Sequence, residues 1–256
     1  MKCTHCNKDL NDDLKFCPYC GHIKETIVKV CIKCGNILDP DHQFCGKCGS
    51  EAIRTEIKNA VADIEGNVYN AVQIGKQVWM SQNMKVTIDR DGNELVLGKD
   101  YWYPNGDESL MEECGLLYTW DAAMRIAPQG WHLPSDTEWE VLMNYISRQS
   151  TFRCSDNVSR IAQSLASTFG WEFVWPWDNR PANNNTTGFS AIPAGGRYSN
   201  GYIHFGHSSL LWSATVCRFN SDYADARYLY FSNLAASIAS ESTNKTFGLS
   251  VRCLRD

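Results

Sequence analysis

The 256-residue sequence lacks any apolar run close to the roughly 20 residues that a membrane-spanning helix needs. Its opening residues, Met1-Lys2-Cys3-Thr4, lack the apolar core of a secretory signal. An excess of positive charge is also missing, because the formal net charge is -5 at pH 7. We therefore expect a cytoplasmic protein without membrane attachment, and nucleic acid is disfavoured as a partner.

Common catalytic motifs are missing as well. The sequence contains no Gly-x-Ser-x-Gly elbow, no His-Glu-x-x-His zinc helix and no phosphate-binding loop. These absences favour a binding protein over an enzyme.

The twelve cysteines are distributed unevenly, with eight before residue 49 and the other four scattered at Cys114, Cys154, Cys217 and Cys253. The first eight form two copies of one pattern, in which two Cys-x2-Cys pairs are separated by ten residues and the copies are offset by 28 residues. The first set is Cys3, Cys6, Cys17 and Cys20, and the second is Cys31, Cys34, Cys45 and Cys48. Such a repeat marks an internal duplication.

Each set of four cysteines indicates a metal site. Two Cys-x2-Cys turns can direct four thiolates at one point, and four sulfurs in a tetrahedron favour zinc. A disulfide framework is disfavoured without a secretion signal, and iron in a rubredoxin-like site is the remaining metal alternative. Residues 1–49 resemble the double zinc-ribbon modules, and we predict two structural Zn2+ ions.

The charge of this segment bears on its partner. Residues 1–60 hold nine Lys or Arg and eight Asp or Glu, so the basic footprint of a nucleic-acid binder is absent. We therefore interpret the ribbons as a structural module that docks a protein partner. Residues 50–62 follow as a predicted linker, in which Ile53, Ile57 and Val61 stand at helical spacing.

The rest of the chain centres on residues 130–139, GWHLPSDTEW. Ser135 can cap a helix, and Glu138, three residues later, completes a capping box. We expect a helix over residues 135–149. Further predicted elements are a hairpin over 68–85 turning at Gly75, helices over 117–126 and 156–167, a hairpin over 195–202, a buried strand over 210–213 and a closing strand over 251–253. Residues 171–188 form a tryptophan-rich loop, either a sugar-stacking shelf or a loop packed on its own domain.

Residues 63–256 resemble the Fibrobacter succinogenes major paralogous domain. The resemblance rests on residues 130–139 together with residues 63–69, 74–80, 117–120, 187–191, 193–195, 211–215 and 248–253. It implies a C-type-lectin-like fold and an overall α+β class, with the pair of zinc ribbons in front. It implies no single activity, since that fold carries unrelated functions.

The stretch from residue 220 to residue 246 is rich in Ser, Ala, Asn and Tyr. Leu229 and Phe231 alternate with Tyr228, Tyr230 and Ser232, which predicts a strand with the first two side chains inward and the others outward. Outward tyrosines among small polar groups are typical of an adaptable binding surface.

This stretch resembles the variable region of lectin-like proteins that retroelements diversify. The resemblance implies ten exposed recognition positions, namely Asn220, Asp222, Tyr223, Asp225, Arg227, Tyr228, Tyr230, Ser232, Ser237 and Ala239. The alternative is an ordinary polar loop of the lectin fold.

Three functions compete. The first is a non-catalytic protein that binds a protein or glycan ligand through its C-terminal surface. The second is an enzyme, because residues 133–140 are similar to a run in the formylglycine-generating oxidases; Cys217 and Cys253, however, share no redox motif. The third is nucleic-acid binding by the ribbons. We favour the first.

Overall fold

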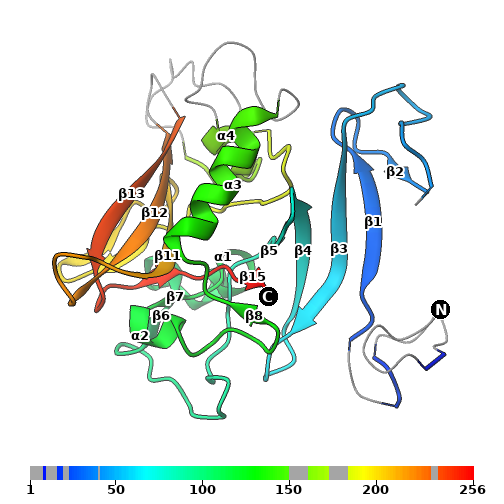
Figure 1. Cartoon of the computed structure of the whole chain (residues 1–256). Coiled ribbons are helices and arrows are strands. Elements are labelled where there is room, and N and C mark those ends of the chain that lie inside the picture. Colours follow the sequence, from blue (N-terminus) through cyan, green and yellow to red (C-terminus); the bar gives the residue numbers. More distant parts are fainter. Residues whose placement is uncertain are drawn as a thin grey trace.

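The computed structural model describes residues 8–9, 16–19, 23–39, 41–149, 161–172, 184–231 and 236–256, without the side chains of residues 231, 236 and 237. This part of the chain is mostly β-sheet with few helices, arranged around two main sheets (Figure 1). None of the described helices combines the length and the hydrophobicity that crossing a bilayer requires.

The first sheet has seven strands and reaches from the cysteine-rich segment to the last residues. Across the sheet they are β2 (Ile37–Leu38), β1 (Thr26–Cys31), β3 (Ile53–Ala62), β4 (Val68–Ile74), β5 (Gln77–Met80), β15 (Leu254–Arg255) and β8 (Trp131–His132). The predicted hairpin with its turn at Gly75 is confirmed, because β4 pairs with β5 and Gly75 has a φ of 64°. The closing strand predicted over residues 251–253 lies slightly later in the chain, at Leu254–Arg255, where Leu254 pairs with Trp79 of β5 as the chain returns to the start of the domain.

The expected helical linker over residues 50–62 is wrong. Strand β3 occupies Ile53–Ala62 and pairs with β1 on one side and with β4 on the other. A β-bulge interrupts its ladder with β4 between Ile57 and Val61, where Asn59 has a φ of 53°. The segment therefore joins the cysteine-rich part to the following domain as one continuous sheet.

The second sheet has six strands and carries the C-terminal stretch. Across the sheet they are β13 (Ala236–Asn244), β12 (Tyr223–Phe231), β11 (Ser208–Val216), β14 (Leu249–Ser250), β7 (Leu117–Tyr118) and β6 (Tyr101–Trp102). A separate hairpin of β9 (Gly196–Tyr198) and β10 (Gly201–Ile203) confirms the turn predicted near residue 200. The buried strand expected over 210–213 is the middle of β11.

Helix α3 (Asp136–Arg148) begins where the sequence predicts and lies between the two sheets (Figure 1). Ser135 and Glu138 form the expected capping box, which pairs backbone N–H groups that the first turn leaves free. The buried Trp139 ring lies 4.6 Å from the Trp79 ring of the first sheet, and Leu229 of the second sheet belongs to the same hydrophobic cluster. The helix therefore fixes the two sheets against each other.

Two other predicted helices differ from the structure. Over residues 117–126 the chain forms strand β7 and then only α2 (Trp120–Ala123). Of the helix expected over 156–167, the described part is α4 (Ile161–Leu165). In the described part of the chain, the remaining short helices are η1 (Pro104–Gly106), η2 (Glu108–Leu110) and α1 (Met111–Cys114). Most of the tryptophan-rich loop, residues 173–183, lies outside the described residues.

Candidate functional site

The second cysteine set forms a four-sulfur cluster at the end of β1. The ligand atoms of Cys31, Cys34, Cys45 and Cys48 all lie within 4.8 Å of one another. The Sγ atoms of Cys31 and Cys48 are 3.6 Å apart, as are those of Cys34 and Cys45. Zinc–sulfur bonds of about 2.3 Å give a tetrahedron with edges of roughly 3.8 Å, so the four residues fit zinc.

Two matched turns shape this cluster. The N–H of Gly35 donates to the Cys31 carbonyl at 2.9 Å, and the N–H of Gly49 donates to the Cys45 carbonyl at 2.7 Å. Both glycines have a φ of 70°, a conformation that costs glycine little. Burial opposes ionisation of Cys31, but hydrogen bonds from the Cys34 backbone and the Cys48 side chain outweigh it and hold the Cys31 pKa at about 6. For Cys34, a backbone hydrogen bond with Asn36 lowers the pKa, but burial and hydrogen bonds with Cys48, Cys45 and Cys31 outweigh it and raise the pKa to about 12. Cys31 therefore favours thiolate, the form that binds metal, whereas a metal ion must displace the proton of Cys34.

The first cysteine set is described only in part. Cys17 is buried, while Cys3, Cys6 and Cys20 lie outside the described residues. The presence of a second four-sulfur cluster thus stays a prediction.

The C-terminal stretch forms the β12–β13 hairpin, and the pairing register divides its side chains between two faces. On one face, Tyr228 lies opposite Ala239 and Tyr230 lies opposite Ser237. On the other face, Asp225 lies opposite Ser242 and Leu229 lies opposite Ile238. The second face packs toward α3 and α4, since Leu229 is fully buried in their cluster.

We call the described side chains of the first group, together with two neighbours, the tyrosine face: Tyr198, Tyr228, Tyr230, Ala239 and Glu241. Tyr230 is 40% exposed and Glu241 is exposed, whereas Tyr198 and Tyr228 are half-buried. The Tyr228 hydroxyl hydrogen-bonds with the Tyr198 hydroxyl and, at 2.7 Å, with Oγ1 of Thr243. These bonds fix the Tyr228 ring at the edge of the exposed surface.

The surroundings of the two hydrogen-bonded hydroxyls, those of Tyr198 and Tyr228, keep both side chains neutral. Burial raises the pKa of Tyr198, and its hydrogen bond to Tyr228 and the charge of Glu241 raise it further. Burial also raises the pKa of Tyr228, although its hydrogen bonds to Thr243 and Tyr198 lower it in part. Both hydroxyls therefore remain able to donate and accept hydrogen bonds at neutral pH.

The predicted recognition set is wrong at Arg227, because this side chain is buried. The side chain is only 1% exposed, and its Nη2 lies 2.5 Å from Oδ1 of Asp136, the first residue of α3. Arg227 is one residue from Tyr228 along an extended strand, so it points to the opposite face and into the protein. Its role is to hold the start of α3 against β12.

The other predicted positions were all expected to be exposed, but their exposure differs. Tyr223 and Asp225 are half-buried on the face away from Tyr228, and Asp225 accepts a hydrogen bond from the Ser242 hydroxyl at 3.0 Å. Asn220 and Asp222 are exposed in the β11–β12 turn, where the Asn220 side chain accepts from the N–H of Asp222 at 2.9 Å. Ser232 lies outside the described residues.

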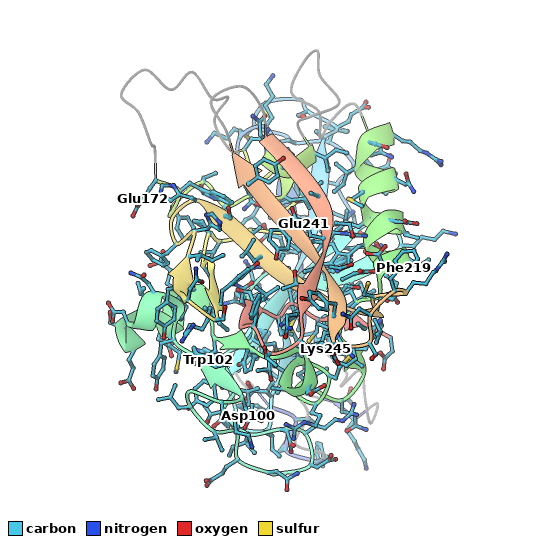
Figure 2. All side chains as sticks on the ribbon, turned by 90° about the vertical axis from the view of Figure 1, so that its left-hand side faces the viewer. Asp100, Trp102, Glu172, Phe219, Glu241 and Lys245 are labelled. Atoms are coloured by element: carbon cyan, nitrogen blue, oxygen red, sulfur yellow. The ribbon has the colours of Figure 1, made fainter. Side chains whose placement is uncertain are left out.

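Two members of the tyrosine face are absent from the sequence prediction, namely Tyr198 and Glu241. Figure 2 shows Glu241 on the β12–β13 hairpin, with Lys245 toward one end of the face and Phe219 at its side. Alternation could have found Glu241, because it stands two residues from Ala239 on the same strand. Tyr198 comes from the β9–β10 hairpin, and nothing in the local sequence connects it to Tyr228.

The two cysteines weighed for redox chemistry occupy different environments. Cys253 is fully buried in the main hydrophobic cluster, and burial raises its pKa. Cys217 is half-buried at the β11–β12 turn, where a hydrogen bond with Ser242 and backbone hydrogen bonds from Phe219 and Asn220 lower its pKa. Neither of these two cysteines, nor the buried Cys114, is in a disulfide.

A cavity of about 580 Å³ opens at another part of the molecule, between the β3–β4 turn and the segment before β8. Ile64, Ile126 and Trp131 supply apolar wall, and Arg90 and Asp91 supply charge. None of the predicted recognition residues lines it.

The fold and the cluster define a class of protein, in which a cysteine-rich zinc-ribbon segment is joined to a mostly β-sheet domain. A family model described as the Fibrobacter succinogenes major domain matches residues 72–255, and the chain belongs to that family. A model described as double zinc ribbon matches residues 3–49, which confirms the arrangement predicted from the cysteine repeat. Searches among curated proteins and among solved structures found no match.

Proposed function

We propose that this protein is a non-catalytic ligand-binding protein, and that its C-type-lectin-like domain presents the tyrosine face to a protein or glycan ligand. The observation that carries the proposal is the shared side of Tyr228 and Tyr230 on β12. Ala239, which lies opposite Tyr228, is small, and Tyr230 is 40% exposed. Tyrosines beside small residues supply large contact area at low cost in conformational entropy.

Rigidity of the face supports the same function. Tyr228 is held by Tyr198 and Thr243, and the strand beneath it is anchored by the buried Leu229 and Arg227. A side chain that is ordered before binding loses little freedom when the ligand arrives. The face can therefore contribute affinity without rearrangement of the sheet.

The zinc ribbons complete the proposal. We infer that they bind two structural Zn2+ ions and dock a protein partner, so that the chain connects that partner to the ligand. A retroelement-diversified tail would explain why polar and aromatic residues are concentrated on the β12–β13 hairpin. A genomic neighbourhood that holds a reverse transcriptase and a near-copy of the last hundred or so bases would support diversification, and its absence would count against it.

The experiment begins with the zinc-loaded full chain, screened on a glycan array and on a displayed protein library. Every hit is then tested with a Tyr228→Ala/Tyr230→Ala double variant and with Val141→Ala. Val141 is 50% exposed on α3 and is a matched control for loss of exposed apolar area. Hits lost only in the tyrosine variant support the proposal; hits retained by it would place binding elsewhere on the domain.

A further inference from the structure

The metal cluster is built into the edge of the seven-stranded sheet. Strand β1 ends at Cys31, and six consecutive residues of β1 pair with β3, from Thr26 opposite Lys58 to Cys31 opposite Ile53. The last pair of this ladder therefore includes a ligand of the four-sulfur cluster. Strand β3 in turn pairs with β4, so one hydrogen-bonded sheet connects the cluster to the family domain (Figure 1).

Within the described residues, β1 has its main strand pairing with β3 and only a short partner on its outer side. Its other neighbour, β2, has two residues and pairs only with Lys29 and Val30. Ile27, nearer the start of β1, is 64% exposed. At that end an ion pair joins Glu25 to Arg255 of β15 at 2.7 Å. One end of β1 thus depends on a surface-side ion pair, and the other depends on the cluster.

The cluster has almost no apolar core of its own. Among the residues that the structure describes, its hydrophobic group contains the four cysteines and two further residues, Leu38 and Ile53. Two aliphatic side chains bury too little surface to order a segment of this size, whereas metal binding to such sites contributes on the order of 10 kcal/mol. Without metal, the Cys31 end of β1 loses the interaction that fixes it.

We propose that metal occupancy of the second ribbon controls the edge of the family domain's sheet. With metal bound, β1 covers β3; after metal loss, β1 detaches and β3 becomes an open edge strand. The backbone groups of Arg54, Glu56 and Lys58, which face β1, are then exposed. Open edges pair with other strands, so the zinc ribbon protects the domain from association through β3.

Hydrogen exchange of the full chain, followed by mass spectrometry, tests this directly. Cys45→Ser removes a ligand of the second ribbon, and Cys17→Ser is the matched control in the first. Both are measured under reducing conditions with zinc present. We expect exchange of the peptide spanning β3 to become faster by about 10-fold or more in Cys45→Ser and to stay unchanged in Cys17→Ser.

Two further measurements complete the experiment: removal and return of zinc in the wild-type chain, and exchange of the α3 peptide as an internal reference. A chelator applied to the wild-type chain should accelerate β3 exchange, and added zinc should restore it. The peptide spanning α3 reports whether the change stays local. Faster β3 exchange that zinc reverses, with α3 exchange unchanged, supports the proposal. Equal acceleration in α3 would show unfolding of the whole domain and would count against detachment of β1 alone. Unchanged β3 exchange after confirmed zinc loss from the second ribbon would overturn it.

Discussion

Tyr228 lies opposite Ala239 in the β12–β13 ladder, so the residue across from the half-buried Tyr228 ring carries only a methyl group. Replacing Ala239 with leucine should cover the ring and reduce binding of any ligand found by screening, by about 10-fold, because a central aromatic contact is lost. The control is Ser240→Leu, one residue away on the other face, which is exposed. Isothermal titration of both variants would show the difference, and equal losses would argue against a role for the tyrosine face.

The ion pair between Arg227 and Asp136 leads to a prediction about stability. Arg227→Ala should lower the free energy of unfolding by on the order of 2 kcal/mol, because it leaves a partly buried carboxylate without its partner. The side chain of Asp136 is 25% exposed and lies at a helix N-terminus, so the loss should be smaller than for a fully buried pair.

Urea unfolding of Arg227→Ala, Asp136→Asn and the double variant measures this interaction as a double-mutant cycle. The same variants should bind ligand as the wild type does, provided they are folded. Weaker binding by folded Arg227→Ala would restore Arg227 to the recognition set.

The two carboxylate contacts of His132 predict that the free energy of unfolding depends on pH. Its Nδ1 lies 2.6 Å from Oδ1 of Asp256 and its Nε2 lies 2.9 Å from Oε1 of Glu138. Burial lowers the His132 pKa, but the hydrogen bonds to the two carboxylates outweigh it and raise the pKa overall. A raised folded-state pKa stabilises the fold below the unfolded value of about 6.5, and this contribution is lost as pH rises through the folded-state pKa.

The measurement is the free energy of unfolding between about pH 5.5 and pH 8 for the wild type and His132→Gln. The two should differ most at the acidic end and converge at the alkaline end. Glu138, whose pKa is lowered despite burial, contributes in the opposite direction, and its part is lost at pH values below that window. A constant difference across the window would show that His132 stays uncharged in the fold.

The predicted metal content can be tested without knowing what the tyrosine face binds. Native mass spectrometry of the full chain should show two zinc ions, and Cys45→Ser should show one. Cys17→Ser should also lose a single ion if the first set forms the predicted site. A wild-type chain with one ion, lost in Cys45→Ser and retained in Cys17→Ser, would leave the first ribbon without metal.

Local signals in the sequence predicted the elements whose cause is local. The capping box of Ser135 and Glu138 depends on residues three apart, and the turn at Gly75 depends on one backbone conformation. Strand β3 was missed because a spacing of four residues, as between Ile53 and Ile57, suits both a helix and one face of a strand. Pairing with β1 and β4 decided between them, and that information is not local.

The candidate site shows the same division. Alternation along β12 correctly placed Tyr230 outward and Leu229 inward, and applying it strictly would have excluded Arg227. The contact between Tyr198 and Tyr228 joins two hairpins that are distant in the sequence, so only the folded chain brings them together. Tyr228 also packs against the main hydrophobic cluster, which contains residues from many parts of the chain.

The affinity of Tyr230→Ala for a screened ligand tests the central claim most directly. Tyr230 is 40% exposed, so its truncation should change the thermal midpoint Tm by less than about 2 °C. We expect a Kd weakened by about 10-fold or more, measured by titration against the zinc-loaded wild type and Val141→Ala. A Kd equal to that of the wild type, in a variant that is equally folded, would contradict it.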